Sequence, residues 1–112
     1  MSDTPTLLIV EDDPDNARSV AEAAADAGFK TVGAATGTAG VELFRQQVPD
    51  VVLSDLVLPD IDGLEVLARL KKLDASIPVI IMTAYGSVES GVRAMHEGAY
   101  DYVTKPLDLD DI

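Results

Sequence analysis

Five short apolar runs, each followed by a segment with helical periodicity, constrain the fold of this chain more than any other feature of its sequence. The runs are rich in Val, Ile and Leu and lack polar alternation, which is typical of strands buried on both faces. Strict alternation of such strands with helices predicts an α/β fold with a doubly wound parallel sheet. The predicted strands are Thr6–Val10, Thr31–Ala35, Val51–Asp55, Pro78–Thr83 and Tyr100–Thr104.

Turn and capping residues mark the first three helices. Asp13 followed by Pro14 is typical of an N-cap and a first helical residue, and Gly28 is expected to end that helix. A second helix is expected to run to about Gln47, and a third to begin at about Gly63.

A fourth helix is expected to begin at Gly86–Ser87 and to end at Gly98. Within it, Val88, Val92 and Met95 recur at helical spacing. Residues with this spacing share one face of a helix. We therefore expect these three side chains to face the core.

Gly91 lies in the interior of this fourth helix, where glycine costs about 1 kcal/mol relative to alanine. Tight packing against a neighbouring element is one explanation. The other is a helix kept marginally stable so that a switching event can move it. The second is slightly favoured, because the helix directly follows Thr83, a candidate site residue.

Bulk composition bounds the possible partners. The 112 residues suffice for one small domain with one core. The formal net charge of -12 argues against direct contact with nucleic acid or an anionic membrane, and it suits a divalent cation or a basic partner. With no cysteine, neither a disulfide framework nor a thiolate metal site is possible. No apolar run has the length of a membrane span, so a cytoplasmic protein is expected.

Polar residues gather at the predicted carboxyl ends of the strands. Glu11 and Asp12 follow the first strand, Asp55 ends the third, and Thr83 and Lys105 belong to the fourth and fifth. In a doubly wound sheet these ends converge on one crevice. Taken alone, Asp55 is equally compatible with a residue that caps its loop; the other four favour a functional site.

The combination of these five residues indicates phosphoryl transfer. Three carboxylates close together repel one another, and a divalent cation is the natural compensation. Oxygen ligands suit Mg²⁺ in particular. Lys105 supplies a point charge for Asp55 or a phosphoryl oxygen, and Thr83 supplies a hydroxyl. Neutralisation of charge and positioning provide most of the catalysis in such reactions.

At these positions the chain resembles the receiver domain of a two-component response regulator. The resemblance covers nearly the whole chain and implies a flavodoxin-like fold with strand order 2-1-3-4-5. After the fifth strand, Leu107–Ile112 is expected to form the first turn of a fifth helix, cut short here. The matching residues are Glu11-Asp12, Asp55, Pro59, Asp62-Gly63, Thr83-Ala84, Tyr102 and Lys105-Pro106.

The resemblance implies a phosphoacceptor and a magnesium site. Asp55 would be the nucleophile that takes a phosphoryl group from a phosphohistidine of a sensor histidine kinase. Asp12 would bind Mg²⁺ directly and Glu11 through water, and Asp55 and the backbone carbonyl of Val57 would complete the metal site. Such a domain is a signalling switch rather than an enzyme with turnover.

The resemblance also implies the residues of the switch. Thr83 and Lys105, with the backbone N–H of Ala84, would bind the phosphoryl oxygens. Tyr102 would change rotamer as Thr83 moves. The Lys105–Pro106 peptide would be cis, which an X-Pro bond permits at low cost.

The output is expected to lie outside this chain. The segments Met82–Glu89 and Glu97–Tyr102 most resemble receivers attached to sigma-54-dependent, NtrC-type transcriptional activators. Residues 1–112 would then be the N-terminal part of a longer protein that contacts DNA only through a separate output domain. A homodimer could form through the face made by the fourth helix, the fifth strand and the missing fifth helix.

Three positions depart from the pattern of the family or bear on its kinetics. Glu11 stands where the family usually has Asp, which shifts a water-mediated metal contact without removing it. Val57 cannot orient an attacking water, and Tyr85 could partly cover the site. A slowly hydrolysing aspartyl phosphate, lasting minutes to hours, is therefore expected.

Three rival functions fit parts of the sequence. A phosphatase of the haloacid dehalogenase type needs a second acid two residues after Asp55, where this chain has Val57. A flavodoxin-like electron carrier needs a phosphate loop after the first strand, where Glu11-Asp12-Asp13 would repel the flavin phosphate. A receiver-like module that only docks partners is the third.

Overall fold

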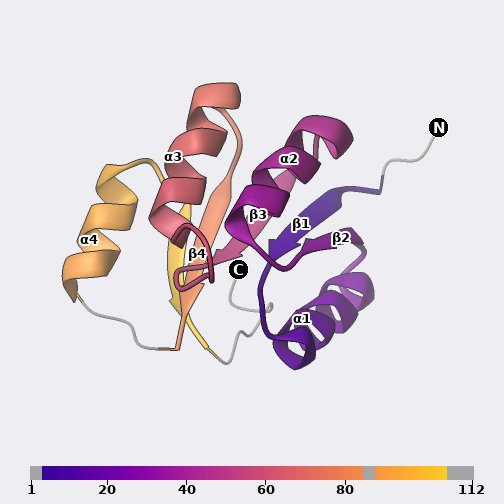
Figure 1. Ribbon diagram of the computed structural model, residues 1–112. Helices are drawn as coiled ribbons and strands as arrows, with labels where there is room; N and C mark the ends of the chain where they lie inside the picture. The colour runs from indigo at the N-terminus through magenta and orange to yellow at the C-terminus, as the bar shows by residue number, and fades with distance from the viewer. Residues whose placement is uncertain (1–3, 85–87, 106–112) are drawn as a thin grey trace.

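The computed structural model describes residues 4–84 and 88–105 and contains a five-stranded, fully parallel sheet (Figure 1). The order β2-β1-β3-β4-β5 places β1 and β3 in the interior of the sheet and β2 at one edge. This confirms the predicted doubly wound, flavodoxin-like sheet. The strands are β1 (Thr6–Val10), β2 (Lys30–Ala34), β3 (Val51–Asp55), β4 (Val79–Thr83) and β5 (Asp101–Thr104).

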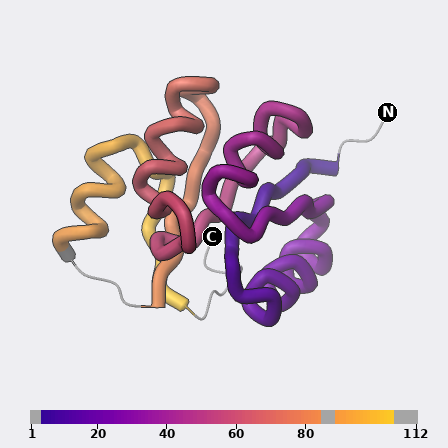
Figure 2. Tube along the Cα trace, viewed as in Figure 1, coloured from indigo at the N-terminus to yellow at the C-terminus, as the bar shows by residue number. Residues whose placement is uncertain are grey.

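Helices cover both faces of the sheet. Figures 1 and 2 show α2, α3 and α4 on one face and α1 on the other. The described helices are α1 (Pro14–Asp26), α2 (Gly37–Gln47), α3 (Gly63–Leu73) and α4 (Val88–His96). None of these helices has the length and apolar character needed to cross a bilayer.

Successive strand residues point to opposite faces, so the sheet carries two apolar layers. On the face of α2, α3 and α4, the buried strand residues include Leu8, Val52 and Ile81. On the face of α1, Leu53 and Met82 are buried with the α1 residues Val20 and Ala24. Burial on both faces explains why the strands are continuous apolar runs.

The predicted boundaries agree with the structure to within a residue or two. Asp13 is the N-cap of α1, its carboxylate accepts from the Asp15 N–H, and Pro14 is the first helical residue. Gly28 follows the end of α1 with a φ of 97°. The predicted start of the fourth helix at Gly86–Ser87 and the fifth helix over Leu107–Ile112 lie outside the described residues.

The prediction for the core-facing side of α4 is wrong. Val92 is 64% exposed and Met95 is 48% exposed, whereas Ala94 is buried. Helical spacing identifies a stripe of residues, but not what the stripe faces. Here small residues, Ala94 and Gly91, form the inner side of α4 and allow the helix to lie close to the sheet. The side chain of Val88 is outside the described part of the chain.

Candidate functional site

Three carboxylates meet at the carboxyl ends of β1 and β3. Asp55 is the last residue of β3, and Glu11 and Asp12 directly follow β1. One oxygen from each of the three lies within 4.8 Å of the others. Glu11 and Asp55 are buried, and Asp12 is exposed to solvent. The cluster is therefore open on the Asp12 side, where a cation could enter.

Lys105 lies between two of these carboxylates. Its Nζ is 2.6 Å from Glu11 Oε1 and 2.9 Å from Asp55 Oδ2. The backbone N–H of Lys105 donates to the Thr83 carbonyl at 2.9 Å, which fixes the lysine at the end of β5. Burial alone would lower the pKa of Lys105, but its hydrogen bonds to Glu11 and Asp55 outweigh burial and raise that pKa.

One lysine does not neutralise the cluster. Burial raises the pKa of Glu11, its interaction with Asp55 raises it further, and Lys105 offsets only part of this effect. A second positive charge near Asp12 would relieve the remaining repulsion. The donors are all carboxylate oxygens, which fits Mg²⁺ better than a metal that prefers nitrogen or sulfur ligands.

The loop after β3 begins close to the Asp55 carboxylate. The Val57 N–H lies 3.4 Å from Asp55 Oδ1, which brings the backbone of residue 57 next to that carboxylate. The Val57 side chain is 65% exposed. The Leu56 N–H donates to the Met82 carbonyl at 2.8 Å, which extends the pairing of β3 and β4 beyond Asp55.

The remaining predicted residues lie on β4 and β5. Thr83 ends β4 and is buried, and Ala84, the next residue, is exposed. Tyr102 lies opposite Ile81 on the neighbouring strand. Pro106 and Tyr85 are outside the described residues, as is the predicted cis peptide.

Tyr102 contacts α4 through its hydroxyl and through its ring. Its hydroxyl lies 2.6 Å from Ser90 Oγ. A Cβ atom added to Gly91 would come 3.2 Å from Tyr102 Cδ2, so the ring lies directly against the glycine. This close approach supports the packing explanation for Gly91. It also means that a rotamer change of Tyr102 would alter a contact of α4.

The structure reveals two interactions that sequence reasoning missed. One is the ion pair of Lys105 with Glu11, since the sequence suggested only Asp55 as the partner. The other involves Asp60, a residue of the segment between β3 and α3. Asp60 Oδ1 accepts from the Gly37 N–H and Oδ2 from the Thr38 N–H, both at 2.8 Å.

A sequence signal for the role of Asp60 existed. The first turn of α2 contains no acidic residue, although an acid is favourable there. Asp60 provides that charge from a different part of the chain. Hydrogen bonds from the side chain and backbone of Thr38 hold the pKa of Asp60 well below its usual range.

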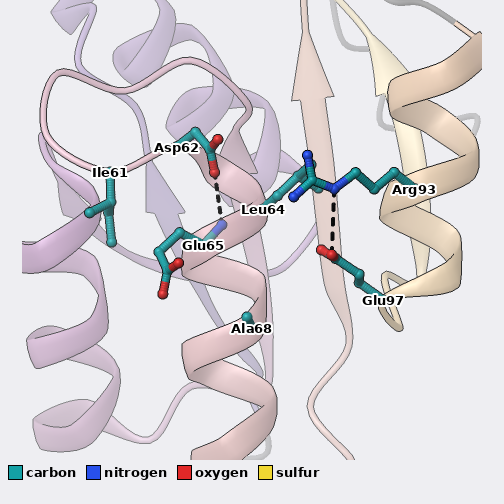
Figure 3. Close-up of a pocket in the computed structure, with 7 residues that line it drawn as sticks. All are labelled: Ile61, Asp62, Leu64, Glu65, Ala68, Arg93 and Glu97. Atoms are coloured by element: carbon teal, nitrogen blue, oxygen red, sulfur yellow. Dashed lines mark hydrogen bonds and ion pairs between the residues drawn. The ribbon is translucent and has the colours of Figure 1, made fainter.

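A hollow of about 330 Å³ lies between α3 and α4 (Figure 3). Its charged groups already have partners. Arg93 pairs with Glu97 at 3.5 Å, Glu65 pairs with Arg69 at 3.0 Å, and Asp62 caps α3 through the Glu65 N–H. Its lining contains none of the three clustered carboxylates and not Lys105. The clustered carboxylates are therefore the better candidate site.

Comparison with known proteins gives one consistent answer. The sequence profile of the response regulator receiver domain matches residues 7–112. Regulatory protein AtoC of Escherichia coli K12 is 42% identical over 106 residues, which cover 95% of this chain and 23% of AtoC. The DNA-binding transcriptional regulator NtrC of the same strain is 40% identical over 106 residues, with coverage of 94% and 23%. The chain thus spans less than a quarter of the length of these two relatives.

Solved structures share the fold. A response regulator receiver domain protein from Clostridium thermocellum superposes with a TM-score of 0.90 at 28% identity, covering 96% of this chain and 86% of that one. A chain in the CheX-CheY-BeF3-Mg+2 complex from Borrelia burgdorferi gives a TM-score of 0.89 at 26% identity, with coverage of 95% and 81%.

Proposed function

This chain belongs to the response regulator receiver domain family, and we propose that Asp55 accepts a phosphoryl group from a phosphohistidine of a sensor histidine kinase. The observation that carries the proposal is the position of Lys105 Nζ, 2.9 Å from Asp55 Oδ2 and 2.6 Å from Glu11 Oε1. The Lys105 ammonium group therefore lies beside the nucleophilic carboxylate, where it can stabilise the negative charge that a phosphoryl group brings.

The chemistry is an in-line displacement. An Asp55 carboxylate oxygen attacks phosphorus, the bond from phosphorus to the histidine nitrogen breaks, and the departing imidazole takes up a proton. The product is an acyl phosphate on Asp55. Thr83, Lys105 and the N–H of Ala84 bind the phosphoryl oxygens.

Glu11, Asp12, Asp55 and the Val57 carbonyl would hold Mg²⁺. When bound, it would neutralise charge on the carboxylates and on the transferring group. The fit rests on the clustered oxygen donors and on the exposure of Asp12.

Phosphorylation would then change the surface formed by α4 and β5. About two added negative charges at Asp55 draw Thr83 and Lys105 toward the phosphoryl group, and Tyr102 follows Thr83. Because the Tyr102 ring lies against Gly91 and its hydroxyl contacts Ser90, its movement reaches α4. The exposed Val92 and Met95 on α4 suit docking of an output domain or of a second copy.

The output we propose is transcriptional control by a longer protein that has this receiver at its N-terminus. Two relatives, AtoC and NtrC, are named as regulators, and NtrC is described as DNA-binding. DNA would be bound by the separate output domain, in keeping with the net charge of -12 on this chain. The protein would act in the cytoplasm, where it would meet the kinase.

Incubation with a small acyl phosphate, with and without Mg²⁺, tests the proposal by intact mass. We expect a Mg²⁺-dependent gain of one phosphoryl group in the wild type and none in Asp55→Asn. Beryllofluoride with Mg²⁺ should shift backbone NMR signals around Thr83, α4 and Tyr102. A folded wild type with no gain and no shift would favour the docking-only module.

The decay of the phosphorylated form tests the role of Val57. Its exposed apolar side chain cannot orient a water for attack on the acyl phosphate. We expect a lifetime of minutes to hours for the isolated domain and faster decay in Val57→Glu. A half-life of seconds in the wild type would contradict this expectation.

A further inference from the structure

The β3–α3 loop, residues 56–62, is tied to the rest of the molecule at both its base and its tip. At the base, the Gly63 N–H donates to the Leu56 carbonyl at 2.8 Å and closes the loop. At the tip, both carboxylate oxygens of Asp60 accept backbone N–H groups of α2, from Gly37 and Thr38. The loop that follows the phosphoacceptor therefore depends on a helix from another part of the chain.

Packing at the tip leaves little freedom. A Cβ atom on Gly37 would come 2.5 Å from Ile61 Cγ1, so the α2 backbone lies directly against the loop. At the base, a Cβ atom on Gly63 would come 2.9 Å from Leu56 Cα. Between these two close approaches lies Val57, whose carbonyl is the proposed backbone ligand of the metal.

We propose that Asp60 is a positioning residue for the phosphoryl-transfer site, because it tethers the β3–α3 loop to the first turn of α2. The tether fixes the direction of the Val57 carbonyl relative to Asp55. This inference rests on the proposed function of Asp55. Asp60 is not one of the three clustered carboxylates, and its two oxygens instead accept amide N–H groups of α2.

The electrostatics of the tether make it persistent at neutral pH. A carboxylate at a helix N-terminus is stabilised by the helix dipole and by unpaired N–H groups. The low pKa of Asp60, caused by its hydrogen bonds with Thr38, agrees with an ionised carboxylate in this position. Thr36 caps the same helix end independently, with Oγ1 accepting from the Ala39 N–H at 3.0 Å.

Thr36 supplies the matched control. Thr36→Ala removes a cap from α2 without touching the β3–α3 loop, whereas Asp60→Ala removes a cap and releases the loop. A structural role in α2 alone would give both variants the same behaviour. If Asp60 positions the loop, Mg²⁺ binding should weaken in Asp60→Ala but not in Thr36→Ala.

The experiment is a titration of the unphosphorylated protein with Mg²⁺, followed by the amide NMR shifts of Asp12, Leu56 and Val57. We expect the Mg²⁺ Kd to rise roughly tenfold in Asp60→Ala, as for other groups that orient a metal ligand. In Thr36→Ala it should stay within about twofold of wild type, a difference of roughly 0.4 kcal/mol. Urea unfolding of both variants measures their loss of stability.

Asp60→Asn gives a second reading that keeps the fold. Its amide oxygen can accept from one N–H, while its NH₂ group cannot accept from the other. We expect an intermediate Kd. Wild-type affinity in both Asp60 variants, or equal weakening in Asp60→Ala and Thr36→Ala, would overturn the inference. If the inference about Asp60 is overturned but Asp55 still takes up a phosphoryl group, the proposed function stands. If the wild type does not bind Mg²⁺, both the inference and the proposed function are overturned.

Discussion

Helices α3 and α4 lie next to each other on one face of the sheet, but they are attached to it very differently (Figures 1 and 2). Among the described side chains of α4, only Ala94 is buried, and the large apolar residues Val92 and Met95 are exposed. By contrast, α3 packs against both the sheet and α2. Its buried residues are Gly63, Leu64, Val66, Leu67 and Leu70.

This difference separates a fixed part of the molecule from a part that can move. The fixed part consists of β3, the β3–α3 loop, α2 and α3, and it carries Asp55 and Val57. The loosely attached part is α4, which contacts β5 and reaches the sheet through Gly91 and Tyr102. The proposed function requires both, because the phosphorylation site would have to stay in place while a neighbouring surface shifts.

The largest expected effect comes from truncating one apolar side chain on each helix. Leu67 is fully buried in α3, and Val92 is 64% exposed on α4. Leu67→Ala should lower the free energy of unfolding by about 2–5 kcal/mol, because it removes buried methyl groups and leaves a cavity. Val92→Ala should change it by no more than about 0.5 kcal/mol. Urea denaturation of both variants measures the difference.

A decrease in the free energy of unfolding of Val92→Ala comparable to that of Leu67→Ala would contradict the proposed difference between the two helices. It would mean that the exposed stripe of α4 is covered in the folded molecule. Met95→Ala is a second test on the same stripe, since Met95 is 48% exposed.

The two helices also contain glycines that differ in what surrounds them. A Cβ atom on Gly63 would come 2.9 Å from Leu56 Cα, a backbone atom that cannot turn away. On Gly91 it would come 3.2 Å from the Tyr102 ring, which can rotate. Gly63→Ala should therefore cost about 1–3 kcal/mol or more. Gly91→Ala should be nearly neutral, since the gain in helix propensity of about 1 kcal/mol offsets the crowding.

A double-mutant cycle tests whether the Tyr102 ring causes the crowding expected in Gly91→Ala. In a Tyr102→Ala background the crowding is absent, so Gly91→Ala should raise the free energy of unfolding by about 1 kcal/mol. Equal effects of Gly91→Ala in both backgrounds would show that the ring does not constrain position 91.

The sequence predicts the fixed part of the molecule better than the movable part. The strands are continuous apolar runs because they are buried on both faces, so their positions could be predicted. Their order is implied only by the resemblance to receiver domains. The orientation of α4 could not, because its inner side is made of Ala94 and Gly91, and small residues give no hydrophobic signal. The exposed Val92 and Met95 then dominate the pattern and suggest the wrong face.

The candidate site also has features that the sequence predicts and features that it does not. Glu11, Asp12, Asp55 and Lys105 each lie at the end of a predicted strand, and the convergence of parallel strands is enough to bring them together. The pairing of Lys105 with Glu11 depends on side-chain geometry that spacing does not encode. Asp60 acts on a helix that begins 23 residues earlier in the chain, and the missing acid in the first turn of α2 does not indicate which distant residue supplies the charge.

A smaller effect is expected at the end of α2. α4 is followed by Gly98, with a φ of 101°, whereas the C-cap of α2 is Val48, with a φ of 45°. A left-handed conformation costs a residue with a side chain about 1–2 kcal/mol, and β-branched valine is especially unsuited to it. Val48→Gly should raise the free energy of unfolding by about 0.5–1 kcal/mol, after allowance for the greater flexibility of glycine in the unfolded chain.

Thermal or urea unfolding of Val48→Gly, with Val48→Ala as the control, measures this gain. Alanine removes the branched side chain but keeps the Cβ atom, so it should recover only part of the gain. Stability below wild type in Val48→Gly would show that the left-handed backbone at Val48 imposes no strain.

The smallest predicted effect is the pH dependence of the tether between Asp60 and α2. Its hydrogen bonds with Thr38 lower the pKa of Asp60 from the ordinary value of 3.8. A carboxylate with a lowered pKa in the folded state stabilises it fully above the unfolded pKa, and this contribution is lost as the pH falls through the folded pKa. The stability difference between wild type and Asp60→Ala should therefore be constant from pH 7 down to about pH 5 and shrink progressively once the pH falls below the unfolded pKa of about 3.9. The difference for Thr36→Ala should not change over this range, because a hydroxyl cap does not titrate. An Asp60 contribution that stays unchanged below about pH 3 would mean that the carboxylate has the same pKa in the folded and unfolded states and that α2 does not hold it.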